Sequence, residues 1–301
     1  AFGTLQKANG LAFLLNTFIV QTSNFGWYGA TNSEISKKYQ TFVTPAGWAF
    51  AIWGLIYISE GLNTAYQFFP SQREHSNKLV KRIGWWWVSA QLFQVAWTFA
   101  FAQESIAVSW IFMLGIYFSL WKVIWALDAG RTGTPSIAAV EPAERIEITY
   151  SDWWLYYFPF QLHFGWITAA TIINTNLLPR AYGGSLELQL ACGIFSLSLP
   201  LLSAAYALLY RLDAVQPFVF AWALYALSSN LADPTNPLPF AAAGTVPVMA
   251  LSTAAGFSSL LLLLGGVGGL LFVLLRAWFG GASEKLRDEL LSSPDASANG
   301  V

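Results

Sequence analysis

The hydrophobic positions of this chain fall into long apolar runs that are separated by shorter polar segments. A helix needs about 20 apolar residues to cross the hydrocarbon core of a bilayer. The pattern therefore predicts an all-α, polytopic membrane helix bundle. The predicted spans are residues 8–28, 45–69, 85–102, 105–127, 153–176, 186–209 and 215–231, followed by an eighth within 239–279.

The apolar segment 239–279 is too long for one ordinary span, and it contains a single charge, Arg276. As a straight helix it would measure about 60 Å, roughly twice the thickness of the hydrocarbon core. We therefore expect a break at Gly256 or within the glycine cluster 265–269. A partial helix and one full span give eight spans in total, and two full spans give nine.

The distribution of basic residues favours eight spans. With eight, 12 of the 15 Lys and Arg residues lie on one side of the membrane, and with nine the division is 9 to 6. Loops on the cytoplasmic side carry an excess of Lys and Arg. The bias predicts that both termini lie on the cytoplasmic or equivalent side.

Composition agrees with a membrane protein, because 55% of the residues are hydrophobic and only 10% are charged. Soluble domains carry about 25% charged residues. The net charge of −1 argues against nucleic acid as a partner. The single cysteine, Cys192, excludes an intramolecular disulfide and a cysteine cluster for metal.

Several polar side chains fall inside the predicted spans, where they need partners. Asn16, Gln21 and Asn24 predict that the first span faces protein rather than lipid. Glu60 costs a few kcal/mol in this position unless it is protonated or paired. It is either a ligand-contacting or proton-linked group, or the partner of the polar face of the first span.

His163 is the only histidine within a predicted span. A neutral imidazole can ligate the metal of a tetrapyrrole, but a core histidine with satisfied hydrogen bonds is the alternative. Gln91 and Gln94 are three residues apart and share a helix face. Together with Asn174 they either bind the polar edge of a ligand or connect helices.

Aromatic residues are concentrated in residues 44–57, where a polar loop meets the second span. Thr44 is a candidate N-cap, and Pro45 suits the first turn of a helix. Trp53 and Tyr57 are four residues apart and lie on one face, which Trp48 flanks. The stretch is either the wall of a ligand site or part of an aromatic belt at the membrane surface.

Three blocks of sequence resemble the tryptophan-rich sensory protein family, which is related to the translocator proteins (TspO/MBR), in its long form. Residues 32–36 and 42–57 look like the segment around the second helix of that family. Residues 91–97 are similar to its third helix, although Gln94 stands where Asn is usual. The signature of its fifth helix is matched by Trp166, Ala170, Ile173 and Asn174.

The resemblance implies a five-helix core in residues 1–180. Further spans in residues 181–280 and a polar tail in 281–301 extend this core. It also implies a flat apolar ligand, either a tetrapyrrole such as a porphyrin, haem or chlorophyll, or else a carotenoid or lipid. An aromatic-lined site with few polar groups is the usual form of a small-molecule pocket. The candidate site residues are Trp48, Phe50, Trp53, Tyr57, Glu60, Gln91, Trp97, His163, Trp166 and Asn174.

The residues leave other functions open. The chain has no nucleotide-binding loop, no His-Glu metal motif and no Gly-x-Ser-x-Gly, so we do not expect an enzyme. One alternative is a structural or pigment-binding subunit of a larger complex or homo-oligomer, such as a photosystem in a plastid thylakoid. Its support is the number of aromatic rings, His163, and the small-residue face of Gly265 and Gly269. The other alternative is a small-molecule transporter.

Overall fold

In the computed structural model, the described residues are 3–69, 73–129, 149–233 and 243–292, and their regular structure is entirely helical. This confirms the predicted all-α class. The long helices are α1 (Thr4–Ser23), α3 (Ile52–Tyr66), α5 (Trp86–Ala102), α6 (Ile106–Ala129), α8 (Phe158–Ala181), α9 (Leu186–Tyr206), α10 (Val215–Ala232) and α12 (Thr245–Ser292). The short elements are α2 (Asn32–Lys38), α4 (Arg73–Ile83) and α7 (Tyr150–Asp152), the 3₁₀ turn η1 (Gly47–Ala51), and the π turns η4 (Trp153–Tyr157) and η5 (Ala207–Arg211).

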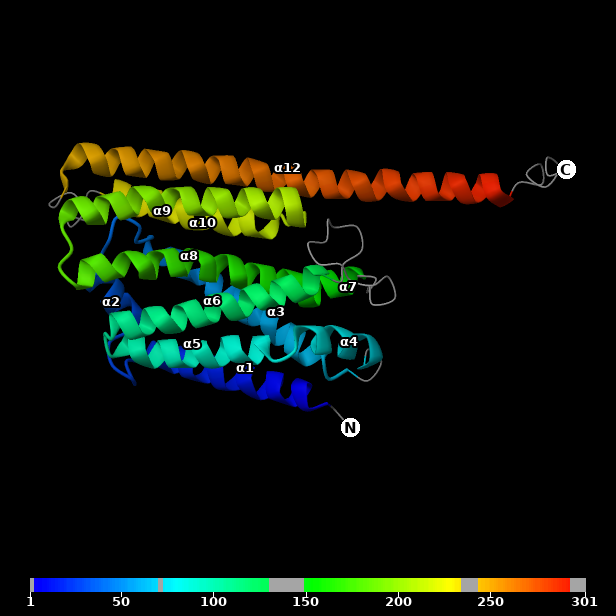
Figure 1. Ribbon diagram of the computed structural model, residues 1–301, viewed down its shortest axis with the longest axis horizontal. Coiled ribbons are helices and arrows are strands. Elements are labelled where there is room, and N and C mark those ends of the chain that lie inside the picture. Colours follow the sequence, from blue (N-terminus) through cyan, green and yellow to red (C-terminus); the bar gives the residue numbers. More distant parts are fainter. Residues whose placement is uncertain (1–2, 70–72, 130–148, 234–242, 293–301) are drawn as a thin grey trace.

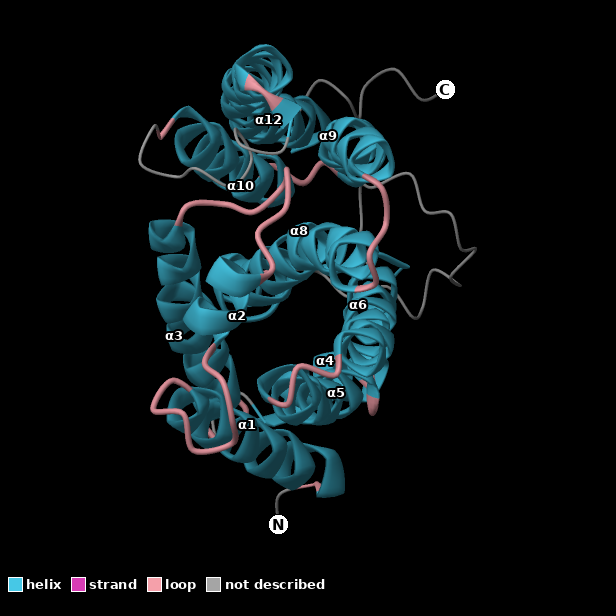
Figure 2. Cartoon of the chain, turned by 90° about the vertical axis from the view of Figure 1, so that its left-hand side faces the viewer, coloured by secondary structure: helices cyan, strands magenta, loops and turns pink. Residues whose placement is uncertain are grey.

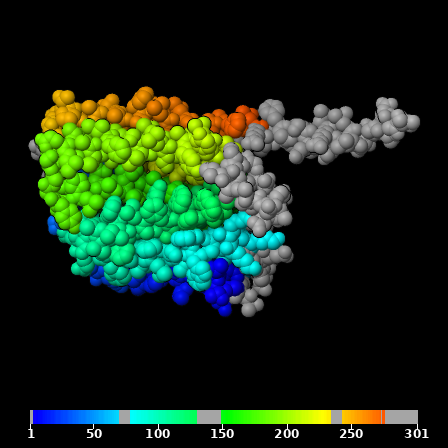
Figure 3. Space-filling view, in the orientation of Figure 1, coloured from blue at the N-terminus to red at the C-terminus, as the bar shows by residue number. Residues whose placement is uncertain are grey.

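The long helices lie side by side and alternate in direction, so that α1 begins and α12 ends at the same end of the bundle (Figure 1). Seen along the helices, α1, α3, α5, α6 and α8 surround a common centre (Figure 2). We call α1–α8 the core. Helices α9, α10 and α12 form a second group, the extension, which packs along α8 as a layer on one side of the core (Figures 2 and 3).

Glycine permits the close approach of core and extension. A Cβ added at Gly165 of α8 would lie 3.2 Å from Val219 Cβ of α10. We expected Pro159 and Gly165 to bend the fifth span or to open it locally. The helix runs without interruption from the π turn η4 into α8, and Pro159 lies two residues after that turn. Pro159 has no N–H to donate to Leu155 O four residues earlier, and this carbonyl accepts from Asn63 Nδ2 instead. The helix is thus opened locally next to Pro159, whereas it continues as regular α-helix through Gly165.

The predicted break in the last apolar segment is wrong. Helix α12 runs unbroken from Thr245 to Ser292, through Gly256 and the glycine cluster, and extends past the other helices (Figure 1). Its 48 residues correspond to about 72 Å. The glycines allow neighbouring side chains to pack closely: a Cβ at Gly269 would lie 2.6 Å from Leu208 Cδ2, and one at Gly266 would lie 3.1 Å from the Phe218 ring.

The second span also starts differently from its prediction. The hydroxyl of Thr44 accepts a hydrogen bond from Thr41 N at 2.9 Å, so Thr44 stabilises a turn and does not cap a helix. A 3₁₀ turn follows at Gly47–Ala51, and the α-helix begins only at Ile52. Because the 3₁₀ turn has about 3.0 residues per turn rather than 3.6, the aromatic side chains before Ile52 point in other directions than an α-helix would give them.

The polar segment 29–43, which we interpreted as a loop with a helical turn starting at Asn32 or Ser33, contains α2 from Asn32, and the basic segment before the third span, which we interpreted as a loop, contains α4. Thr31 caps α2 in a capping box with Glu34, and α4 buries Leu79, Val80 and Ile83. The tail expected from Gly280 is helical as far as Ser292. The surface helix predicted at 141–147 and the disordered end predicted for the tail, 293–301, lie outside the described residues.

Candidate functional site

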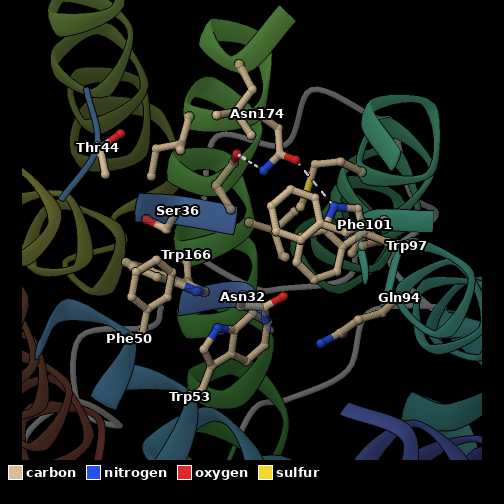
Figure 4. A pocket seen from close by; sticks show the side chains of 16 residues that line it. Asn32, Ser36, Thr44, Phe50, Trp53, Gln94, Trp97, Phe101, Trp166 and Asn174 are labelled. Carbon is tan, nitrogen blue, oxygen red and sulfur yellow. Dashed lines mark hydrogen bonds between the residues drawn. The ribbon is translucent and has the colours of Figure 1, made fainter. Parts of the chain in front are cut away.

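A narrow cavity lies inside the core, between α3, α5, α6 and α8, and α2 covers its mouth. Its volume is about 70 Å³. Apolar and aromatic side chains make up most of its wall, as the close view in Figure 4 shows. The lining residues are Asn32, Ser36, Thr44, Phe50, Trp53, Gln94, Trp97, Phe101, Met113, Ile116, Trp166, Ile167, Ala170, Ile173, Asn174 and Leu177.

Ring contacts fix the aromatic walls. The Phe50 and Trp166 rings meet edge to face, with centroids 5.7 Å apart, and Trp53 meets Trp166 in the same way at 6.5 Å. On the opposite wall, Trp97 and Phe101 are one helical turn apart on α5 and stack at 4.7 Å. Flat faces on two sides suit a flat apolar ligand.

Three amide side chains from different helices line the cavity: Asn32 of α2, Gln94 of α5 and Asn174 of α8. Asn174 Oδ1 accepts a hydrogen bond from Trp97 Nε1 at 3.3 Å, and Asn174 Nδ2 donates to Ala170 O at 2.9 Å (Figure 4). Asn174 therefore orients Trp97 across the gap between α5 and α8. Gln94 enters the cavity from α5 (Figure 4).

A carboxyl–imidazole pair lies deeper in the core, away from the cavity wall. His163 Nδ1 of α8 is 2.7 Å from Glu60 Oε1 of α3, and both side chains are fully buried. Trp87 Nε1 donates to Glu60 Oε1 at 3.3 Å, and Gln91 Nε2 donates to Glu60 Oε2 at 3.1 Å. One of the two predicted roles of Glu60 was a hydrogen bond to the first span, but these partners come from α5 and α8.

Amide groups extend this pair into a network that reaches the cavity. Asn16 of α1 donates from Nδ2 to Gln91 Oε1, and also to Gln94 Oε1 at 3.1 Å. Gln94 Nε2 donates to the Tyr57 hydroxyl at 3.2 Å. Gln91 and Gln94 thus connect helices, which was one of the two predicted roles. Gln21 and Asn24, by contrast, are exposed near the end of α1.

The ten predicted site residues therefore divide into three groups. Trp48 lies apart from the others, because the 3₁₀ turn directs it to α10, where its ring is 4.7 Å from that of Trp222. Tyr57, Glu60, Gln91 and His163 belong to the buried network. The cavity is lined by the other five, Phe50, Trp53, Trp97, Trp166 and Asn174.

The cover of the cavity was not predicted from the sequence. Asn32 and Ser36 are four residues apart on α2, so they share the helix face that meets the cavity. Ile35 is fully buried in the cluster with Phe101 and anchors the helix. Both Asn32 and Ser36 lie in the first block that carried the family resemblance, and their spacing was the available signal.

An exposed ion pair also holds α2 in place. Lys38 Nζ contacts Glu104 Oε2 in the turn between α5 and α6, and the Tyr39 hydroxyl donates to the same oxygen at 2.8 Å. The hydrogen bonds from Lys38 and Tyr39 lower the pKa of Glu104 from its ordinary value. The cover of the cavity is therefore fixed partly by contacts at the surface of the protein.

The cavity agrees with a tetrapyrrole in chemistry but not in size. Flat rings and three amides suit the face and edge of a macrocycle, but pockets for ligands of that size measure roughly 300 Å³ or more, against about 70 Å³ here. The lining residues therefore do not accommodate a tetrapyrrole unless ring side chains move. His163 is not among the lining residues, and its Nδ1 contacts Glu60. Within the described residues, no group of three or more His, Cys, Asp and Glu side chains could hold a metal ion.

Comparison with known families decides the relationship that the three sequence blocks suggested. Residues 6–264 match a family model described as TSPO-like protein. The chain belongs to this family. No curated protein and no solved structure matches it. Among the described residues, three helices are long and apolar enough to cross a membrane, at Ile106–Ala129, Leu186–Arg211 and Thr245–Phe272. This TSPO-like protein is an integral membrane protein.

Proposed function

We propose that this TSPO-like protein is a non-enzymatic membrane protein that binds a flat apolar molecule in the core cavity. The observation that carries the proposal is the convergence of five residues from four elements: Phe50 of η1, Trp53 of α3, Trp97 of α5, and Trp166 and Asn174 of α8. Mostly apolar walls with a few oriented polar groups are the usual form of a ligand pocket.

A tetrapyrrole is the ligand class that the family resemblance implies, and we keep it as the first candidate. Its entry requires the ring side chains of the cavity to separate. Helix α2, which forms part of the wall, is held in place by the contacts of Lys38 and Tyr39 with Glu104 at the protein surface. The amides of Asn174 and Gln94 would then face the polar edge of the ring. Protoporphyrin IX is therefore the probe with which the proposal is tested.

The test compares two tryptophans that are five residues apart. Trp53→Leu keeps an apolar side chain in the cavity but removes a ring face, which contributes about 0.5–1.5 kcal/mol beyond its buried area. The affinity for protoporphyrin IX, measured from saturable quenching of tryptophan emission, should fall several-fold to about tenfold. Trp48→Leu is the matched control, because Trp48 faces Trp222 outside the cavity, and its affinity should equal that of the parent.

Equal binding by the Trp53→Leu and parent proteins would contradict the proposal, and a subunit of a larger assembly would then be the better interpretation. Two features that favoured that alternative make contacts within the chain itself. Gly265 and Gly269 pack against Leu208, and His163 Nδ1 pairs with Glu60, while His163 Nε2 is buried without a hydrogen-bond partner among the described residues. Transport has no specific support among the described contacts.

We further propose that the eight long helices all cross the membrane, with both termini on the cytoplasmic-equivalent side. The basic-residue bias and the alternating helix directions support this arrangement. In sealed vesicles, with Cys192→Ser as background, cysteines at Ser36 and Ser292 should react with an impermeant label from opposite sides. Labelling of both positions from one side would exclude the eight-span topology.

A further inference from the structure

A second and much larger cavity lies where the core meets the extension, and none of the predicted site residues lines it. Its volume is about 490 Å³, within the usual range for ligand pockets. Residues of η1, α3, η4 and α8 form the core side, and α10 with Leu270 of α12 forms the other side. We call this the junction cavity. It is lined by Ala51, Ile52, Leu55, Trp153, Phe158, Leu162, Ala214, Val215, Phe218, Val219, Trp222 and Leu270.

The side chains that line the junction cavity are all hydrocarbon or aromatic. The indole N–H of Trp222 donates to Ala49 O at 2.9 Å, so this polar group is already satisfied by the wall. A ligand that carries charges or many hydrogen-bonding groups would lose its water without gaining partners here. The apolar lining of the junction cavity therefore favours a hydrocarbon ligand.

The residues that line the junction cavity form stripes along the helix axes. Ala214, the N-cap of α10, and the α10 residues Val215, Phe218, Val219 and Trp222 fall at helical spacing and form one stripe about 12 Å long. Phe158 and Leu162 form a parallel stripe on α8. The two stripes follow the helix axes, and in a membrane-spanning bundle the acyl chains of the bilayer run in roughly the same direction.

The mouth of the junction cavity opens on the outer side of the bundle. Leu55 is 48% exposed and Leu270 is 42% exposed, and both line the cavity. The small side chains of Ala51 and Ala214 leave the space that larger residues would fill. In a membrane-spanning bundle, an apolar opening on this side meets the hydrocarbon of the bilayer.

We propose that the junction cavity is a binding site for one acyl chain of a membrane lipid, which fills the space between the core and the extension. The site is preformed, because the walls are joined by Trp222 to Ala49 and by the close packing of Gly165 on Val219. It is separate from the cavity of the proposed function and does not depend on it.

The test uses a phosphatidylcholine with a photoactivatable diazirine in its acyl chain, in vesicles that contain the full-length protein. Leu55→Trp places an indole in the mouth of the junction cavity. Ile58→Trp is the matched control, because Ile58 is 64% exposed on the same helix but does not line the cavity. Crosslinks in the parent protein should concentrate at residues 51–55 and 214–222. Leu55→Trp should lower their yield about fivefold or more, whereas Ile58→Trp should leave it unchanged.

Equal crosslinking in the two variants, or crosslinks spread evenly over exposed residues such as Leu11 and Leu264, would overturn the proposal. If Leu55→Trp fails to fold, Ala214→Leu fills the cavity from the opposite wall and should give the same loss. Native mass spectrometry gives a further test. If the parent protein is a dimer and Leu55→Trp is a monomer with unchanged crosslinking, the proposal is overturned, and the mouth is an interface between copies of the chain.

Discussion

The core and the extension are both helical, but they differ in how many helices their buried polar side chains connect. In the core, side chains from different helices bond to each other, as Asn16 does to Gln91 and Glu60 does to His163. In the extension, buried serines bond to backbone carbonyls: Ser259 Oγ donates to Ala221 O at 2.8 Å, and Ser252 Oγ donates to Ser228 O at 2.9 Å. The network of side chains that joins four helices around Glu60 is therefore a feature of the core, whereas the side-chain pairing of the extension is centred on Arg211.

This difference has a consequence for how each region meets lipid. Of the three described helices that are apolar enough to cross a membrane by composition alone, two, α9 with η5 and α12, belong to the extension. The polar helices of the core need neighbours that satisfy or shield their side chains. We infer that the extension shields one side of α8, which carries His163, from the bilayer.

The largest expected effect on the free energy of unfolding comes from the buried carboxyl–imidazole pair of Glu60 and His163. Glu60→Ala leaves His163, Gln91 and Trp87 without their acceptor, and it should lower the free energy of unfolding by about 3–5 kcal/mol. Glu60→Gln retains an acceptor and should lower it by about 1 kcal/mol or less. Unfolding in mixed micelles, followed by circular dichroism, measures both changes.

A matched control in the extension sharpens this comparison. Ser259→Ala removes a buried hydrogen bond to backbone and should lower the free energy of unfolding by less than about 1 kcal/mol. The double variant Glu60→Ala with His163→Ala should be less destabilised than the sum of the two single variants, because the two residues contact each other. Additive losses would show that the pair is not coupled.

The next largest expected effect on the free energy of unfolding comes from Arg211, at the junction of the core and the extension. Arg211 of η5 donates from Nε to Asp128 Oδ2 at the end of α6, at 2.6 Å, and from Nη1 to Gln216 Oε1 at 3.0 Å. Its Nη2 is 3.3 Å from Asp213 Oδ2. Arg211→Met retains the apolar stem but leaves two carboxylates without their counter-charge. The free energy of unfolding should fall by about 2–3 kcal/mol, less than for Glu60→Ala because Asp128 is partly exposed and can recover water.

The position of this loss can be measured by hydrogen exchange. In Arg211→Met, amides of α9 and α10 should exchange faster, while those of α3 and α5 should keep the rates of the parent. Faster exchange throughout the bundle would mean that the core and the extension unfold as one unit, and the distinction between them would then have no energetic basis.

The positions of the helices could be predicted from the local pattern of apolar residues. The features that could not be predicted, such as the unbroken course of α12, depend on packing between residues far apart in the sequence. The fourth span was predicted at 105–127, and α6 occupies Ile106–Ala129 because a continuous apolar run defines both of its ends. The unbroken course of α12 depends on Leu208 and Phe218, which lie far from its glycines in sequence. From sequence alone, a glycine is equally consistent with a break in a helix and with close packing against another helix. Only the residue that packs against it distinguishes the two.

The candidate site follows the same rule. Trp53, Trp97 and Asn174 were predicted from motif and spacing within regular helices, and all three line the cavity. Trp48 lies elsewhere because a five-residue 3₁₀ turn, which the sequence does not distinguish from an α-helix, changes its direction. The pairing of His163 with Glu60 joins residues 103 positions apart, and no local pattern predicts it.

The smallest expected effect is at the cover of the core cavity, where the ion pair is exposed rather than buried. The hydrogen bonds from Lys38 and Tyr39 hold the pKa of Glu104 below its ordinary value of 4.5. For a carboxyl group with a lowered pKa in the folded state, the stabilisation is complete above pH 4.5 and is lost as the pH falls through the lowered pKa. A spin label on Ser36→Cys, in a Cys192→Ser background, should therefore become more mobile only below pH 4.5. Glu104→Gln should remove this pH dependence, and its persistence in that variant would show that another group controls α2.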